Sequence, residues 1–231
     1  MLAVRWVEME ALALHNVVAL DGTFPVLAGA SFEAPQGSLV AILGGNGAGK
    51  TSMLRTLAGL TTIVEGSGRV LGFDLSTQAS GLVGNVCLLG HGTGLYEELS
   101  PQANLKFLAT IGRLDRSGVA SSLQRVGLTG RTATTPLQQL SAGQRRRAAL
   151  ASLILRSPAL WLMDEPHASL DRGGRALVDA LVAEAVGRGS TVVLTSHDAN
   201  EASEAADLVV ELVGGATSGA RRGGGGIRHV S

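Results

Sequence analysis

A glycine-rich stretch at residues 43–52, LGGNGAGKTS, restricts the possible folds of this chain more than any other segment. It follows a continuous apolar run, SLVAIL, which is typical of a buried parallel strand. It precedes TSMLRTLAGL, which has the apolar pattern of a helix. The spacing Gly44-x-x-x-x-Gly49-Lys50-Thr51 in this context is that of a phosphate-binding loop. The sequence therefore predicts an α/β fold that binds nucleotide phosphates.

Each position of this loop has an expected role. Glycines let backbone N–H groups turn toward a phosphate, and the positive end of the following helix favours the same anion. The Lys50 ammonium should reach the β and γ oxygens, and the Thr51 hydroxyl should ligate Mg²⁺. The expected nucleotide-binding residues are Gly44, Asn46, Gly47, Ala48, Gly49, Lys50, Thr51 and Ser52. The alternative is a glycine-rich turn with a purely structural role.

A second apolar run, ALWLMD at residues 159–164, ends in two acids, Asp164 and Glu165. Ligands of open α/β sheets bind at the carboxyl ends of the strands, where these acids should lie. We expect Asp164 to hold Mg²⁺ through its water shell and Glu165 to act as the general base toward an attacking water. The alternative is a strand end with two solvated acids.

The bulk properties limit the classes of function. A chain of 231 residues with strands alternating with helices is expected to form one α/β domain, at residues 1–213. Zero net charge gives no general attraction to nucleic acid or anionic membrane. The first residues lack a signal-peptide layout and no apolar stretch reaches spanning length, so membrane contact is expected through another protein. Residues 214–231 are rich in glycine and are expected to be a disordered tail.

Three further motifs carry a resemblance to a family. LSAGQ, at residues 140–144, precedes a helical pattern that opens with three arginines, and HASLD and LTSHD follow the second strand. In order and spacing the chain resembles the ATPase domain of ABC transporters over about residues 12–213. The resemblance implies a parallel-sheet core with an antiparallel β subdomain and an inserted helical subdomain at about residues 92–157. We expect at least two of the three arginines, Arg145–Arg147, to lie on a solvated helix face.

The same resemblance implies roles for these motifs. The signature residues, which would bind the γ-phosphate of another subunit's ATP, are Leu140, Ser141, Ala142, Gly143 and Gln144. Asp171 corresponds to the acid of the D-loop, and His197 to the histidine that contacts the γ-phosphate beside the catalytic Glu165 and Lys50.

Two departures from the family pattern stand out. His91 occupies the position of a usual glutamine and is a further candidate ligand for Mg²⁺. Asp21 occupies the position of the aromatic residue that stacks on adenine, and Phe24 is a weak substitute. Weaker discrimination between bases should follow from the missing ring.

The subgroup that the chain most resembles is the ATP-binding subunit of haem-exporter, or cytochrome c biogenesis, complexes. The similar segments are GKTSMLR, LLGHGTGLYEELSPQANL, LSAGQRRRAALASLIL and LWLMDEPHASLD, whereas His167 and the glycine-rich tail depart from the pattern. The resemblance implies ATP and Mg²⁺ as cofactors, ATP hydrolysis coupled to transport, a homodimer of ATPase subunits and a transmembrane permease. It also implies a peripheral position on the cytoplasmic face of the inner or plasma membrane, and no nucleic acid partner. Leu95 and Tyr96 are candidate docking residues, with core packing as an equal alternative.

Other classes fit less well. A GTPase would need an Asn-Lys-x-Asp segment, which the sequence lacks, and a small-molecule kinase would not need LSAGQ. A DNA-repair ATPase of this family would carry a long coiled-coil insertion, and a translation-factor type would carry two cassettes. The alternatives that stay open are the ATPase of a drug, lipid or polysaccharide exporter and, less favoured, a soluble ATPase without a transport role.

Overall fold

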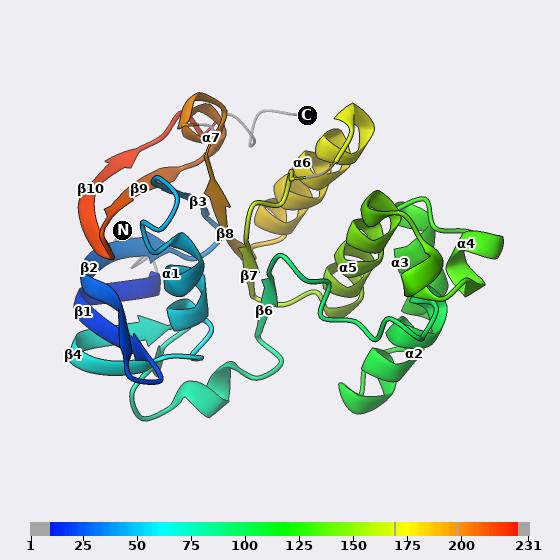
Figure 1. The fold of residues 1–231 in the computed structure, drawn as a ribbon, viewed down its shortest axis with the longest axis horizontal. Coiled ribbons are helices and arrows are strands. Elements are labelled where there is room, and N and C mark those ends of the chain that lie inside the picture. The colour runs from blue at the N-terminus through cyan, green and yellow to red at the C-terminus, as the bar shows by residue number, and fades with distance from the viewer. Residues whose placement is uncertain (1–9, 169, 198, 226–231) are drawn as a thin grey trace, which may run out of the picture.

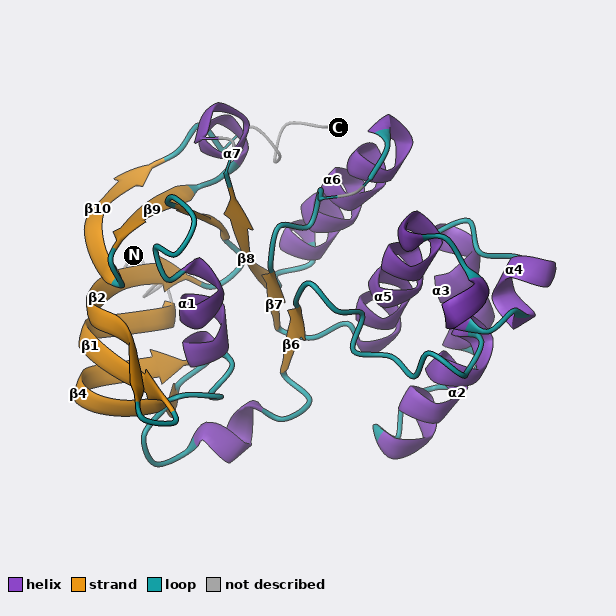
Figure 2. Cartoon of the chain, viewed as in Figure 1, coloured by secondary structure: helices purple, strands orange, loops and turns teal. Residues whose placement is uncertain are grey.

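Two β-sheets and a group of helices beside them make up the structure, a computed structural model that describes residues 10–168, 170–197 and 199–225 (Figure 1, Figure 2). The strands are β1 Glu10–Asp21, β2 Phe24–Pro35, β3 Leu39–Leu43, β4 Thr62–Val70, β5 Phe73–Asp74, β6 Val86–Leu89, β7 Leu160–Met163, β8 Thr191–Ser196, β9 Leu208–Val213 and β10 Ala216–Arg222. The helices are α1 Lys50–Leu57, α2 Pro101–Ile111, α3 Gly118–Arg125, α4 Arg131–Thr134, α5 Ala142–Arg156, α6 Arg172–Gly187 and α7 Ala199–Ala205, with 3₁₀ turns η1 Ala79–Leu82 and η2 Leu137–Gln139.

The larger sheet has the strand order β10-β9-β3-β8-β7-β6. Strands β9, β3, β8, β7 and β6 are parallel, and all five residues of β3 are buried because both of its faces are covered. Leu43 pairs with Ser196 and Met163 pairs with Leu194, so the carboxyl ends of β3, β8 and β7 lie together. This edge therefore collects the phosphate loop, the two acids and the end of β8.

The smaller sheet is antiparallel, with the order β2-β1-β4-β5. Helix α1 contacts β2 of this sheet and β7 and β8 of the larger one. Its buried residues Met53, Leu54 and Leu57 belong to a core that both sheets share. Burial from two sides thus fixes the helix that begins at the phosphate loop.

The helical subdomain stands apart from α1 and the antiparallel sheet (Figure 1) and consists of α2–α5, at residues 101–156. Its buried leucines, such as Leu105, Leu123 and Leu150, join a core that continues onto α6 and the larger sheet. The expected parallel core, antiparallel β subdomain and inserted helical subdomain are confirmed. Among the described helices, none is both long and apolar enough to cross a bilayer.

The C-terminal part differs from the expected disordered tail. Residues 216–222 form β10, which pairs antiparallel with β9 through a register from Ala216↔Val213 to Arg222↔Leu208. The N–H groups of Gly223, Gly224 and Gly225 then donate to carbonyls around the end of α7. Backbone hydrogen bonds, which need no apolar side-chain pattern, hold this edge strand. Residues 226–231 lie outside the described chain, as do residues 1–9, Ser169 and Asp198.

Candidate functional site

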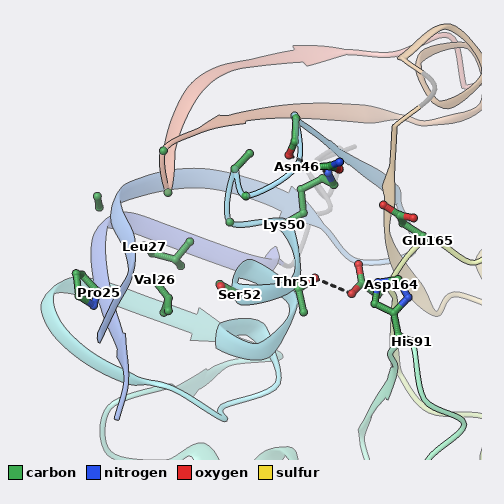
Figure 3. Close-up of a pocket in the computed structure, with 17 residues that line it drawn as sticks. Pro25, Val26, Leu27, Asn46, Lys50, Thr51, Ser52, His91, Asp164 and Glu165 are labelled. Carbon is green, nitrogen blue, oxygen red and sulfur yellow. Dashed lines mark hydrogen bonds between the residues drawn. The ribbon is translucent and has the colours of Figure 1, made fainter. Parts of the chain in front are cut away.

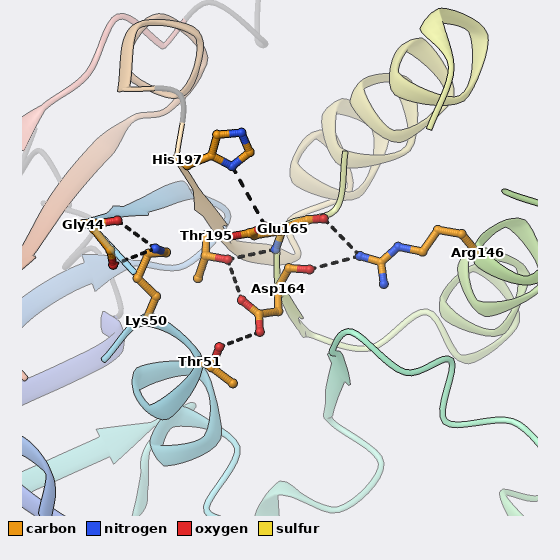
Figure 4. Close-up of polar contacts among 9 residues, drawn as sticks. Gly44, Lys50, Thr51, Arg146, Asp164, Glu165, Thr195 and His197 are labelled. Atoms are coloured by element: carbon orange, nitrogen blue, oxygen red, sulfur yellow. Dashed lines mark hydrogen bonds and ion pairs between the residues drawn. The ribbon is translucent and has the colours of Figure 1, made fainter. Parts of the chain in front are cut away.

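The phosphate loop connects the end of β3 to the start of α1. Gly44, Gly47 and Gly49 have φ angles of 154°, 76° and 102°, in the region that favours glycine. A Cβ on Gly44 would lie 2.6 Å from the carbonyl oxygen of Leu212 in β9, so the loop also packs too closely for a side chain there. The Lys50 ammonium is buried and donates to the carbonyls of Gly44 at 2.7 Å and Gly45 at 3.1 Å (Figure 4). The predicted strand, loop and helix are therefore present.

The loop borders a pocket of about 590 Å³. In Figure 3, Pro25, Val26 and Leu27 lie at one end, and His91, Asp164 and Glu165 lie at the other. The residues that line it are Pro25, Val26, Leu27, Ala28, Gly45, Asn46, Gly47, Ala48, Gly49, Lys50, Thr51, Ser52, His91, Asp164, Glu165, Gly214 and Gly215. All the predicted nucleotide-binding residues except Gly44 are among them, and Gly45 adds to them. The volume lies in the range of small-molecule and cofactor pockets.

Asp164 lies between two hydroxyl groups. The Thr51 hydroxyl donates to Asp164 Oδ2, and the Thr195 hydroxyl, at the end of β8, donates to Asp164 Oδ1, both at 2.7 Å (Figure 4). Asp164 is only 3% exposed, so these bonds replace water around its carboxylate. Among the described residues, no group of three or more His, Cys, Asp and Glu could hold a metal ion. A hydroxyl and a carboxylate fit Mg²⁺, which prefers oxygen ligands and takes few of them from the protein when phosphates and water supply the rest.

Glu165 lies next to the pocket in an unusual backbone conformation. Its φ angle is 44°, in the left-handed region, and its N–H donates to the Thr195 hydroxyl at 2.8 Å. Its carboxylate oxygen Oε2 lies 4.0 Å from Nδ1 of the exposed His197 (Figure 4). The structure thus brings the three expected catalytic residues together, with Lys50 and Glu165 lining the pocket and His197 beside Glu165.

Arg146 is a site residue that sequence reasoning missed. Its guanidinium donates to the carbonyls of Gly90 at 2.6 Å, Asp164 at 3.1 Å and Glu165 at 3.4 Å. Burial lowers the pKa of Arg146 from its ordinary value, and the nearby Asp164 carboxylate opposes that shift. Helix α5 of the helical subdomain is therefore tied directly to the acids and to the loop that carries His91.

The expectation of a solvated arginine face is wrong. All three arginines are half-buried. Arg145 donates to the carbonyl of Leu140 at 3.3 Å, and Arg147 donates to the carbonyl of Val126 at 3.1 Å. Carbonyls at loop and helix ends need donors, and a sequence does not show where these carbonyls lie.

One end of the pocket is formed by Pro25, Val26 and Leu27, and we call it the base end because the base of a nucleotide would lie there. This end lacks an aromatic ring. Among its described lining residues there is no Phe, Tyr or Trp, and Phe24 is 75% exposed outside it. Asp21 instead pairs with Arg55, with 3.1 Å between Oδ2 and Nη2. The weak expectation that Phe24 replaces the missing ring therefore has no support here, and Pro25 and Val26 form the wall in its place.

The signature residues lie outside this pocket. Ser141 is the N-cap of α5, in a capping box in which its hydroxyl accepts from Gln144 N at 3.2 Å and Gln144 Oε1 accepts from Ser141 N at 3.0 Å. Leu140 is buried, whereas Ser141 and Ala142 are exposed and Gly143 and Gln144 are half-buried. Asp171 is the N-cap of α6, where its carboxylate accepts from Gly174 N at 2.7 Å.

The two candidate docking residues differ. Leu95 packs against the hydrophobic core, as the alternative of core packing expected. Tyr96 is 54% exposed and makes an edge-to-face contact with Phe107, with 5.4 Å between the ring centroids. Ile111, one helical turn after Phe107, is also exposed. These three residues, Tyr96, Phe107 and Ile111, form what we call the α2 apolar face.

Comparisons with known proteins agree with this geometry. A family model described as "ABC transporter" matches residues 27–168. The chain is 43% identical to the cytochrome c biogenesis ATP-binding export protein CcmA of Pseudomonas fluorescens over 162 residues, which cover 70% of this chain and 76% of that protein. It is 38% identical to the protein of the same name in Methylococcus capsulatus, over 81% of this chain and 91% of that protein.

A solved structure has the same fold. The ATP-binding cassette MJ0796, in a dimeric post-hydrolysis state bound to ADP and Pi, superposes with a TM-score of 0.81. The match covers 91% of this chain and 98% of that one at 22% sequence identity.

Proposed function

Because this chain belongs to the ABC transporter family, in which it is an ATP-hydrolysing subunit similar to the cytochrome c biogenesis ATP-binding export proteins, we propose that it powers haem delivery for cytochrome c maturation. One observation supports ATP hydrolysis most directly. Lys50, Asp164 and Glu165 line one pocket beside the phosphate loop, and His197 lies next to Glu165. The similarity to the named relatives carries the assignment to cytochrome c biogenesis.

The geometry suggests how this chain's residues act on ATP. Backbone N–H groups of the phosphate loop and the Lys50 ammonium bind the β- and γ-phosphates. The oxygen of the attacking water bonds to the γ-phosphorus, and Glu165 accepts a proton from that water. At the same time, the bond from the γ-phosphorus to the ADP oxygen breaks. His197 donates a hydrogen bond to the γ-phosphate and, at 4.0 Å from Glu165, lies where it can orient that carboxylate.

Thr51 and Asp164 are the residues that would hold Mg²⁺, and His91, which lines the same end of the pocket, is a third candidate. When bound there, Mg²⁺ supplies charge neutralisation of the β and γ oxygens. The Thr195 hydroxyl would fix the orientation of the Asp164 carboxylate through its 2.7 Å bond.

We further propose that two copies share each ATP. The signature residues 140–144 do not line the pocket of their own chain, although Ser141 and Ala142 are exposed at the start of α5. A helix N-terminus with an exposed hydroxyl can bind the γ-phosphate held by a second copy. Asp171, whose side chain is 80% exposed at the start of α6, would lie at the same contact between copies.

The partner that receives the resulting motion would be a transmembrane permease. The α2 apolar face, Tyr96, Phe107 and Ile111, offers exposed rings and an aliphatic side chain on the helical subdomain. Asn104, 1% exposed, accepts from Tyr96 N at 2.8 Å and donates to the carbonyls of Tyr96 and Leu99, so it holds Tyr96 in place. The chain would then act as a peripheral subunit at the cytoplasmic face of the inner or plasma membrane, with no nucleic acid partner.

The test is complementation in a bacterial host that lacks its own cytochrome c biogenesis ATPase. Co-expression of this chain with its cognate permease should restore holo-cytochrome c, measured by haem staining, and the Glu165→Gln variant should not. If the pair leaves holo-cytochrome c absent but moves a drug, lipid or polysaccharide precursor in vesicles, the assignment to haem delivery is wrong. Hydrolysis that no copurified membrane protein alters would favour an ATPase without a transport role.

A further inference from the structure

The turn between β9 and β10 connects two separate parts of the nucleotide pocket. Its two residues, Gly214 and Gly215, have φ angles of 57° and 81°, the pattern of a tight two-residue hairpin turn. The Gly215 N–H donates to the carbonyl of Ala48 in the phosphate loop, at 2.9 Å. The Gly215 carbonyl accepts from the N–H of Ala28 in β2, also at 2.9 Å. One residue thus joins the phosphate loop to the strand that forms the base end of the pocket.

The three backbones leave too little room for a Cβ at its ordinary contact distance. A Cβ on Gly215 would lie 3.2 Å from Ala28 N and Leu27 Cα, and 3.3 Å from the carbonyl oxygen of Val26. From the other side, a Cβ on Gly49 would lie 3.2 Å from Gly215 Cα. The nearby atoms all belong to backbone, which cannot move aside as the end of a flexible side chain can. Gly215 therefore sets the spacing between the phosphate loop and residues 26–28.

The same turn is part of the pocket wall. Gly214 and Gly215 line the pocket together with residues 25–28 and the phosphate loop. A nucleotide in this pocket must reach from the Pro25–Leu27 wall to Lys50, so its affinity depends on the separation of those two parts. The C-terminal hairpin, whose sequence suggests only a flexible tail, adds backbone hydrogen bonds to both of these parts, beside the packing of α1 against β2.

We propose that Gly215 is a positioning residue for ATP binding. It holds the phosphate loop at the distance from residues 26–28 that lets one nucleotide contact both ends of the pocket. The inference rests on the proposed function, since it assumes that ATP occupies this pocket. It assigns to the β9–β10 hairpin a role in substrate affinity that none of the sequence motifs carries.

The test compares Gly215→Ala with a matched control, Gly72→Ala. Gly72 is the second residue of the β4–β5 turn, has the same φ of 81°, and has no atom within 4 Å of the position of a Cβ. Both substitutions introduce the same left-handed alanine, but only Gly215→Ala presses against the phosphate loop and β2. We expect Gly215→Ala to raise the Kd for a fluorescent ATP analogue and the KM for ATP by about tenfold. The kcat should fall less than about threefold, and Gly72→Ala should leave all three constants within about twofold.

Equal constants for the two variants, or a loss in kcat without a change in Kd, would show that Gly215 only closes a hairpin. Titration of the wild-type chain distinguishes failure of this inference from failure of the proposed function. A wild-type chain that binds no ATP would overturn both, whereas a wild-type chain that binds ATP leaves the test to the two variants. If Gly215→Ala does not fold, amide hydrogen exchange of the wild-type chain decides instead. Addition of MgATP should slow exchange in residues 212–217 but not in residues 219–222 at the far end of the same hairpin. Unchanged exchange in residues 212–217 would contradict the proposal.

Discussion

At the scale of single residues, Glu165 shows how the fold supports a strained site. A non-glycine residue with a φ of 44° costs about 1–3 kcal/mol, which the surrounding structure must offset. Here the Thr195 hydroxyl accepts from the Glu165 N–H and donates to the Asp164 carboxylate, so one side chain fixes both acids. The strained backbone turns the Glu165 carboxylate toward the pocket while Asp164 stays buried.

The substitution Glu165→Gln should keep the shape of this side chain and remove its basicity. We expect ATP affinity within about threefold of wild type and a loss of about 10²–10⁴ in the rate of hydrolysis, which is the size of a general-base contribution. Phosphate release under single-turnover conditions measures the rate. Glu65→Gln, the same chemical change at an exposed position on β4, is the control and should hydrolyse ATP normally. Near-normal turnover by Glu165→Gln would remove Glu165 from the role of general base.

The base end of the pocket predicts weak discrimination between nucleotides. With Pro25 and Val26 in place of a stacking ring, affinity should come mainly from the phosphates. ATP and GTP should therefore differ by less than about tenfold in Kd, or about 1.4 kcal/mol, in a competition titration. Phe24→Ala should change neither Kd, because Phe24 is 75% exposed and does not line the pocket. A strong ATP preference that Phe24→Ala abolishes would mean that this ring moves onto adenine.

At this scale the sequence predicted the motif residues but not the residues that hydrogen-bond to them. The glycine spacing and the acids after an apolar strand are local patterns, so Lys50, Thr51, Asp164 and Glu165 could be identified directly. Thr195 could not, because its role depends on the register in which Met163 pairs with Leu194 and so places the next residues of β7 and β8 side by side. Arg146 was missed for a similar reason, since its acceptors are backbone carbonyls from two distant loops.

At the scale of elements, an ion pair connects α3 of the helical subdomain to α6. Arg125 of α3 forms a two-bond ion pair with Glu184 of α6, and Arg188 lies 2.5 Å from the same carboxylate. The hydrogen bonds from Arg125, more than its charge, lower the pKa of Glu184. The groups are partly exposed, so the contribution to stability should be modest.

Glu184→Gln should therefore reduce the free energy of unfolding by about 0.5–1 kcal/mol at neutral pH, measured by urea denaturation. A lowered pKa in the folded state means that this contribution is complete above the ordinary carboxyl pKa and is lost as the pH falls through the lower, folded value. The difference between wild type and variant should thus shrink in acid. A difference that does not shrink as the pH is lowered to the point where the wild type itself begins to unfold would mean that the glutamine disturbs packing rather than an ion pair.

The elements themselves were predicted unevenly. The strand, loop and helix around residues 38–60 follow from an apolar run, glycines and a helical period, which all favour one structure. Strand β10 was missed because ATSGARR has neither alternation nor a buried face, with most of its residues exposed. Its stability comes from backbone bonds to β9 and from the contacts of the turn, which only the three-dimensional arrangement supplies.

At the scale of the whole molecule, the nucleotide pocket and the signature occupy different places in one chain. Ser141 lies at the start of α5 and is absent from the pocket lining. Under the proposed shared arrangement, a single copy would offer the phosphate loop to one site and the signature to another. Two copies facing each other would then complete both sites.

Ser141→Arg tests this arrangement. The long cation should block closure of the proposed dimer and reduce hydrolysis at least about a hundredfold, while a monomer binds ATP with Kd within about twofold of wild type. Equilibrium titration measures the Kd, and light scattering of chains that also carry Glu165→Gln measures dimerisation with MgATP. Ser121→Arg, at an exposed position on α3, is the matched control. A loss of ATP binding by the Ser141→Arg monomer would show that the signature serves its own chain's pocket.

The low reactivity of the single cysteine makes it possible to measure closure of the proposed dimer by fluorescence. Cys87 is buried on β6, where Arg156 contacts its sulfur at 3.6 Å, and burial raises the pKa of its thiol. It therefore stays a poorly reactive neutral thiol at the pH used for maleimide labelling. A cysteine placed at the exposed Thr129 would carry a fluorophore selectively, with no need to remove Cys87. Chains labelled separately with donor and acceptor dyes would then report their approach by Förster transfer as ATP is added.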